Sequence, residues 1–309
     1  MSKCKYTSIG GQALIEGIMM KNKEKTVMAV RGKDGEIILE PVNFTSITEK
    51  YKFLKWPIIR GVVNFVESMI MGYKTTMRSA ELSGFAEEDG EEIKPSAMTA
   101  IGIVGAVLGV ALAVVLFMYL PALIFDGVNA LFGGNLTPFK SLFEGLLKLA
   151  VFVVYVLCVS LMKDIKRVFS YHGAEHKTIF CFEKGLPLTI ENVRAQKRLH
   201  PRCGTSFMIL IFIVSIILST LIQSFFPFLT ASRILWVAIK LLIIPIVCGL
   251  GYELIKICGK HDNLFTKIVA FPGLQLQRVT TKEPDDDMIE IAIAALNAVL
   301  EVKTEEEIN

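Results

Sequence analysis

The chain has 309 residues, of which 52% are hydrophobic and 20% are charged. Its mean hydropathy of +0.52 is higher than a soluble domain usually reaches, because much of a soluble surface must face water. The net charge of +3 is too small to indicate nucleic-acid binding, and no nucleic-acid partner is expected. The six cysteines show no regular spacing, so no disulfide framework is expected either.

The N-terminal region, residues 1–52, is predicted to form a small α+β unit. Residues 26–31 (TVMAVR) have the composition of a strand, residues 33–35 (KDG) that of a turn, and residues 36–39 that of the paired strand. Glu16 is an acid within the apolar stretch ALIEGIMM. We expect it either to lie at the edge of an element or to take part in a site.

Residues 53–95 are predicted to form an amphipathic helix followed by an acidic linker. Apolar residues recur in alternating steps of three and four, at positions 56, 59, 63, 66, 70 and 73. One interpretation is that the helix lies in the membrane interface, with its cations near anionic lipid headgroups. The other is that the apolar stripe packs on membrane-spanning helices of the same chain.

Four segments have the length of about 20 mainly apolar residues that is needed to cross a bilayer. They are residues 97–125, 142–162, 204–229 and 234–254. The alternative is a set of buried helices in a large soluble core, which two uncharged runs of more than 24 residues disfavour. Gly105 and Gly109 form a small-xxx-small pair, which allows close packing within the chain or in a homo-oligomer.

Basic residues predict the orientation in the membrane. The segment 163–202 holds nine of them and only four acids, whereas the segment 126–141 holds Lys140 alone and 227–232 holds none. Because basic loops stay inside, the long segment and both termini are predicted to be cytoplasmic. The chain is thus expected to be a multi-pass protein of the cell membrane.

The fold class expected is a mainly α integral membrane protein with a small strand-containing N-terminal unit. Its units are 1–52, 53–95, 96–162 with the first two spans, 163–203 in the cytoplasm, 204–256 with the last two spans, and 257–309 in the cytoplasm. In the last unit, residues 283–287 (EPDDD) place a proline and acids where a helix begins. Its apolar positions 289, 293, 296 and 300 predict docking on another cytoplasmic element.

Three of the four histidines lie in the segment between the second and third spans. His172, Glu175 and His176 form the pattern H-x-x-E-H, and His200 and Cys203 follow. Positions i and i+4 share one face of a helix, so His172 and His176 can bind one divalent metal ion. His200 and Cys203 can complete the coordination sphere, and Glu175 is then placed to act as a base.

Imidazole and thiolate ligands suit zinc best, with iron or another late transition metal as the alternative. The competing interpretation has the histidines as hydrogen-bonding groups and Cys203 as a packed thiol. H-x-x-E-H is also the pattern of inverzincin metalloproteases, in which a distant glutamate completes the site. Glu253 is the distant acid here, but the rest of the chain does not resemble those larger soluble enzymes.

Several motifs together resemble the YqhQ family of bacterial membrane proteins, and the resemblance covers nearly the whole chain. They are residues 10–20 (GGQALIEGIMM), 171–177 (YHGAEHK), 200–205 (HPRCGT), 272–277 (PGLQLQ) and 280–284 (TTKEP). The resemblance implies a protein of unassigned function that is considered a metal-dependent enzyme because of the same histidines. Gln275 departs from the family, where tryptophan is expected, and this bears on the interfacial contact rather than on the metal.

The leading hypothesis is a membrane-embedded metal-dependent hydrolase that works at the cytoplasmic leaflet on a lipid-linked or membrane-protein substrate. Membrane lipids are then the expected partners. The second hypothesis is a scaffold, assembly factor or regulator, in which four protein ligands close a structural metal site. A transporter is the third, since Lys240 is a charge within the fourth span, but four spans would suffice only in an oligomer.

Overall fold

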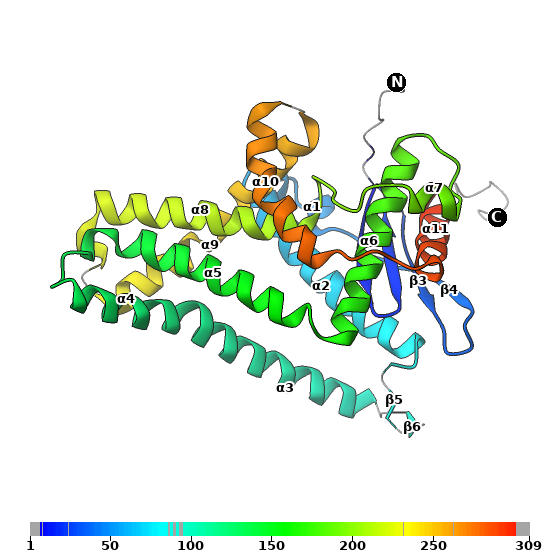
Figure 1. Cartoon of the computed structure of the whole chain (residues 1–309), viewed down its shortest axis with the longest axis horizontal. Helices are drawn as coiled ribbons and strands as arrows, with labels where there is room; N and C mark the ends of the chain where they lie inside the picture. The colour runs from blue at the N-terminus through cyan, green and yellow to red at the C-terminus, as the bar shows by residue number, and fades with distance from the viewer. Residues whose placement is uncertain are drawn as a thin grey trace.

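The structure is a computed structural model that describes residues 7, 9–23, 25–85, 87–88, 91–92, 95–230, 232–261 and 263–300. Long helices run side by side along the longest axis of the molecule, and a small sheet lies at one end of them (Figure 1). The part of the predicted acidic linker at 89–90 and 93–94 lies outside the described residues. In the described part of this linker, β5 (Glu87–Glu88) pairs with β6 (Glu91–Glu92).

The N-terminal sheet is an antiparallel meander of four strands in the order β1-β2-β3-β4. The strands are β1 (Gly10–Leu14), β2 (Gly17–Lys21), β3 (Thr26–Arg31) and β4 (Ile37–Pro41). The predicted hairpin of residues 26–39 is therefore confirmed as β3 and β4. Glu16 stands in the tight turn between β1 and β2 with φ of 51°, a conformation that few non-glycine residues adopt.

The two faces of the sheet bury two different sets of side chains, because neighbouring residues in a strand point to opposite faces. Ile18 and Ala29 belong to the cluster that contains the C-terminal helix α11 (Asp286–Leu300). Met19 and Met28, which are opposite each other in the register, pack instead with Met71 of α2 (Ile59–Leu82). The sheet is thus covered by helices on both faces.

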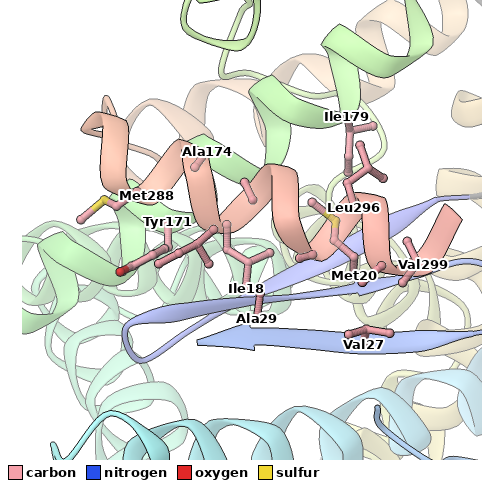
Figure 2. Close-up of a cluster of buried hydrophobic side chains, with 14 residues drawn as sticks. Ile18, Met20, Val27, Ala29, Tyr171, Ala174, Ile179, Met288, Leu296 and Val299 are labelled. Atoms are coloured by element: carbon pink, nitrogen blue, oxygen red, sulfur yellow. The ribbon is translucent and has the colours of Figure 1, made fainter. Parts of the chain in front are cut away.

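Helix α11 and α6 (Lys163–Glu183) pack against each other and against the sheet, and side chains from all three converge in one core (Figure 2). Ile289 and Leu296 of α11 are fully buried, which confirms the predicted docking of the C-terminal helix. The short α7 (Ile190–Arg194) also contacts α11.

Among the residues that the structure describes, four helical segments are long and apolar enough to cross a membrane, as predicted. They are Gly102–Leu131, Thr137–Val159, Gly204–Phe225 and Leu235–Cys258. The first is built from α3 (Pro95–Val114), the π-helical segment η2 (Val115–Tyr119) and α4 (Leu120–Leu131), and the second from η3 (Thr137–Phe139) and α5 (Lys140–Val159). The third is α8 (Gly204–Phe225), η4 (Pro227–Thr230) follows it, and the fourth lies within α9 (Arg233–Lys260).

The small-xxx-small pair of the first span, Gly105 and Gly109, makes no close packing contact with the described residues. A Cβ atom added at Gly105 or Gly109 would meet no atom within 4 Å among the described residues. Gly102 alone is close to another element, since a Cβ there would lie 2.9 Å from the hydroxyl oxygen of Tyr73 in α2. The pair at 105 and 109 therefore faces outward.

The predicted amphipathic helix is present as α2, preceded by α1 (Ile47–Lys50) and η1 (Lys52–Lys55). It packs on α9 through a glycine face, where a Cβ at Gly61 would lie 2.9 Å from the Cα of Gly249. Most of the predicted apolar stripe is not in this contact, because Val66, Ile70 and Tyr73 are exposed. The stripe therefore lies on the surface of the structure.

Helix α10 (Leu264–Thr280) extends across the helical bundle at the junction with the sheet-containing end (Figure 1). Its C-terminal half packs on α8, where a Cβ at Gly273 would lie 2.5 Å from the hydroxyl of Ser206. Its N-terminal half presents exposed apolar side chains, namely Leu264, Phe265, Ile268 and Phe271.

Candidate metal centre

Helix α6 places His172 and His176 one turn apart, with their rings 4.4 Å from centroid to centroid. His172 Nδ1 lies 2.9 Å from the carbonyl oxygen of Thr280, and His176 Nδ1 contacts the carbonyl oxygen of Arg198. A carbonyl can only accept a hydrogen bond, so each Nδ1 carries the proton. In both rings this leaves Nε2 with a lone pair for a metal ion, as in histidine metal ligands oriented by a backbone carbonyl.

Cys203 brings a sulfur atom to the same place. It is the N-terminal capping residue of α8, and its Sγ accepts a hydrogen bond from the backbone N–H of Thr205 at 3.4 Å. His172 Nε2 lies 3.1 Å from this sulfur. One ligand atom each from His172, His176 and Cys203 lie within 4.8 Å of one another, so the structure brings together three of the four predicted ligands.

The donor set fits a tetrahedral metal ion such as zinc. Zinc binds imidazole nitrogen at about 2.0–2.1 Å and thiolate sulfur at about 2.3 Å, so its ligand atoms must cluster within a few ångströms. His176 Nε2 is buried and has no hydrogen-bond partner among the described residues. A buried polar atom without a partner is rare, because its desolvation is not compensated, and a metal ion would compensate it.

His200 lies next to this group but is not part of it in the structure. Its ring is 5.6 Å from that of His176, and its Nε2 lies 3.8 Å from a carboxylate oxygen of Glu183. Gln277 fixes the backbone, accepting from the N–H of His200 and donating to its carbonyl oxygen, both at 2.8 Å. The role of His200 as a fourth ligand stays a prediction, since its ring would have to turn away from Glu183.

Burial lowers the pKa of His176 and of His200. For His200 the nearby Glu183 opposes this effect, but burial outweighs it. Both imidazoles are therefore neutral at neutral pH, which is the form that binds a metal ion.

Glu175 is buried against strand β1, with 5% of its surface exposed. Burial raises the pKa of its carboxyl group, although the neighbouring His172 and a hydrogen bond from the backbone of Gly11 act in the opposite direction. A Cβ atom at Gly11 would lie 3.0 Å from the Glu175 side chain and 2.6 Å from the carbonyl oxygen of Met19. The glycine therefore allows the strand to approach the carboxyl group.

A second polar network, centred on Glu183, lies next to His200, and it was not predicted from the sequence. Glu183 accepts hydrogen bonds from the backbone N–H of Thr7 and from the guanidinium group of Arg202. Burial raises the pKa of Glu183, but the contacts with His200, Thr7 and Arg202 outweigh it and set this pKa at about 2. The charged carboxylate thus ties the N-terminal segment to the HPRCGT motif.

The two acids whose roles were open are both bound by arginines. Glu16 is held by Nε and Nη2 of Arg167 and by the hydroxyl of Tyr171, so it has a structural position at the edge of the sheet. Glu253 is held in the same way by Arg60, which joins α9 to α2. Glu253 is not in the group of three close ligands, so the comparison with inverzincins gains no support.

The fold and the site define a mainly helical protein with four candidate membrane spans and a histidine–cysteine cluster beside a small antiparallel sheet. A model of the DUF1385 family, described as a protein of unknown function, matches residues 56–302, and the chain belongs to this family. The uncharacterized protein YqhQ of Bacillus subtilis (strain 168) is 33% identical over 325 residues, covering 100% of this chain and 98% of that protein. No solved structure matches the chain.

Proposed function

We propose that this protein is embedded in the cell membrane with both termini and the metal centre on the cytoplasmic side. Nine basic residues in the segment 163–202 support this orientation, because basic loops are retained inside. The sheet, α6 and α11 lie at the same end of the helical bundle (Figure 1). The turns after the first and third spans lie at the other end and carry few charges.

We also propose that lipids contact two exposed apolar surfaces at the cytoplasmic membrane boundary. The first is the stripe of α2 with Val66, Ile70 and Tyr73, and the second is the N-terminal half of α10 with Phe265 and Phe271. Apolar faces on helices that lie beside a membrane-spanning bundle are typical of interfacial helices. A substrate taken from the lipid phase would pass this boundary to reach the centre.

The function that we propose is that of a metal-dependent hydrolase. The observation that carries the proposal is the unpartnered, buried Nε2 of His176 within a group of three ligand atoms, with Glu175 buried alongside. A bound divalent ion with three protein ligands would supply Lewis acidity and lower the pKa of a coordinated water. Glu175, whose pKa is raised by burial, would take the proton, because a base works best when its pKa lies near the working pH.

A specific observation also favours the second candidate, a scaffold with a structural metal site. His200 lies beside His176, and a rotation of its ring would add a fourth ligand and close the site. The substrate class, a lipid-linked molecule or a membrane protein, rests on the location of the centre at the membrane boundary.

The hydrolase and the scaffold both require a bound metal ion, so the metal content of the purified protein tests both proposals. Protein purified without added metal should contain about one metal ion per chain, and the double substitution His172→Ala, His176→Ala should remove it. His261→Ala is the matched control, because this histidine is exposed at the C-terminal end of α9, outside the group. Equal metal content in the double variant and in the control would end both proposals.

A further inference from the structure

A second polar site lies within the membrane-spanning bundle, away from the metal centre. It is a cavity of about 180 Å³ lined from four spans, with Lys148, Lys240 and three serines (Ser141, Ser215 and Ser219) among apolar side chains. Ser215 is twelve residues beyond Cys203 on α8, which corresponds to about 18 Å along the helix. The cavity therefore belongs to the half of the bundle remote from the histidines.

The charges around the cavity do not balance. Lys240 Nζ lies 2.9 Å from a carboxylate oxygen of the buried Glu144, and Lys140 Nζ lies 3.9 Å from the other oxygen and from Asp126. Electrostatic interactions also link Lys148 to both Lys240 and Glu144. Three lysines thus share two carboxylates, and Lys148 is the one for which no ion pair with a carboxylate is seen among the described residues. An uncompensated charge at membrane depth is costly and usually marks a functional site.

A hydroxyl group at the cavity also lacks a partner. Ser141 is 3% exposed, and its Oγ makes no hydrogen bond within the described part of the chain. Its backbone N–H is already used by the side chain of Gln223 at 2.8 Å, so the residue is held in place, and its hydroxyl is enclosed by protein atoms without a hydrogen bond. A buried hydroxyl without a hydrogen bond is destabilising unless a ligand or water satisfies it. Ser141 and Lys148 both line the cavity, so the two side chains can donate to an anion there once the hydroxyl turns toward it.

The residues that line the cavity indicate the kind of molecule to which the anionic group belongs. Leu241 and Ile244 line it and are 56% and 50% exposed on the outer surface of the bundle, where lipid chains would lie. A volume of about 180 Å³ is below the roughly 300–1,000 Å³ of pockets that enclose a whole drug-sized ligand. Met118, which also lines the cavity, belongs to the π-helical segment η2, a feature that often occurs at functional sites.

We propose that this cavity binds the terminal phosphate group of an anionic membrane amphiphile such as phosphatidic acid, whose chains stay in the surrounding lipid. Lys148 and the hydroxyl of Ser141 donate to the phosphate, and Lys240 is shared between the phosphate and Glu144. The site is separate from the metal centre, so it adds a lipid-binding function to whichever reaction that centre performs.

The chain offers a fluorescent reporter for this site. Of its two tryptophans, Trp56 is exposed on the surface, whereas the indole ring of Trp236 lies 5.0 Å from Lys240 Nζ. In a Trp56→Phe background, emission therefore comes from beside the cavity alone. The full-length protein would be placed in phosphatidylcholine vesicles that contain a fixed fraction of phosphatidic acid with brominated chains, or the same fraction of brominated phosphatidylcholine.

We expect brominated phosphatidic acid to quench Trp236 several-fold more efficiently than brominated phosphatidylcholine. Lys148→Met and Ser141→Ala should each reduce this preference. Lys163→Met, which removes the same charge from an exposed position at the other end of the bundle, should leave it intact. Added inorganic phosphate should not compete, because a free anion lacks the lipid chains.

Several results would overturn the proposal. They are equal quenching by the two lipids, an unchanged preference in both cavity variants, and an equal loss in Lys163→Met, which would indicate general attraction to anionic lipid. Complete competition by inorganic phosphate would assign the cavity to the free anion instead of an amphiphile. If Lys148→Met does not fold, the result for Ser141→Ala tests the proposal alone. This variant should fold, because the hydroxyl that it removes makes no hydrogen bond within the described residues.

Discussion

His172 Nδ1 lies 2.9 Å from the carbonyl oxygen of Thr280, so the first candidate ligand of the proposed metal centre is oriented by a residue 108 positions further along the chain. Thr280 is the last residue of α10, and the other end of this helix carries the exposed Leu264 and Phe265. One helix therefore connects the proposed membrane surface to the ring of a ligand.

The topology can be tested by cysteine labelling of intact cells. A cysteine at Lys184, which follows α6 at the sheet-containing end, should stay unlabelled by a membrane-impermeant thiol reagent. A cysteine at Asn135, in the turn after the first span, should be labelled, and it controls for expression and reactivity. Both signals are compared with the unsubstituted protein, which contains six cysteines. Labelling at position 184 before the cells are lysed would refute the proposed orientation.

Gly11 should be required for stability, whereas its neighbour should not. In Gly11→Ala the new Cβ would lie 2.6 Å from the carbonyl oxygen of Met19 and 3.0 Å from Glu175, so β1 would have to shift. Overpacking of this kind costs about 1–3 kcal/mol. Gly10→Ala is the control, since a Cβ there meets no described atom within 4 Å. Thermal unfolding in detergent should show a lower Tm for Gly11→Ala only, and equal values for the two variants would contradict the close approach.

Glu183 should make stability depend on pH in the acidic range. Its pKa of about 2 in the folded protein is below the ordinary value of 4.5, so the ionised form stabilises the fold at neutral pH by about 3 kcal/mol. This contribution is complete above the ordinary pKa and is lost as the pH falls toward the folded-state pKa. The difference in unfolding free energy between wild type and Glu183→Gln should therefore shrink from about pH 6 to about pH 3.

The control for this measurement is Glu191→Gln, because Glu191 is exposed in the first turn of α7. Its effect should be small at every pH, as for most surface substitutions. A difference for Glu183→Gln that stays constant between the two pH values would show that Arg202 and Thr7 do not bind the ionised carboxylate.

Features encoded by local periodicity could be predicted from the sequence. The four apolar segments, the β3–β4 hairpin and the shared helical face of His172 and His176 each depend on residues close together in the chain. The orientation of His200 could not be predicted, because it depends on Gln277, which is 77 positions away. The carbonyl of Thr280 could not be predicted either, since a backbone group of any residue can fill that role.

The cavity between the candidate membrane spans could not be predicted from the sequence for the same reason. Lys240 and Lys148 are visible in the sequence as charges within apolar segments, but only the packing of α5, α8 and α9 brings them together with Ser141. The exposed stripe of α2 is a further case. Its apolar period of three and four is typical of a buried helix face as much as of an interfacial one, and glycines on another face decide how the helix packs.

Glu175→Gln separates a hydrolase from a scaffold. Glutamine has the size of the neutral acid, and burial already raises the pKa of Glu175, so the variant should fold and should retain its metal ion. If Glu175 is the base, function in cells should fall by about 10²–10⁴-fold, the usual contribution of general-base catalysis. If the centre is structural, Glu175→Gln should leave function in cells nearly unchanged, whereas His172→Ala should unfold the segment 163–202.

Metal content must be measured on the same Glu175→Gln protein, because the carboxylate lies close enough to His172 to interact with it electrostatically. A residue that only orients a ligand would lower metal affinity about 10–100-fold when it is lost, and addition of excess metal would then restore function. A base is needed whenever water reacts, so excess metal would restore nothing. A Glu175→Gln protein that is fully loaded with metal and fully functional would remove the hydrolase and leave the scaffold.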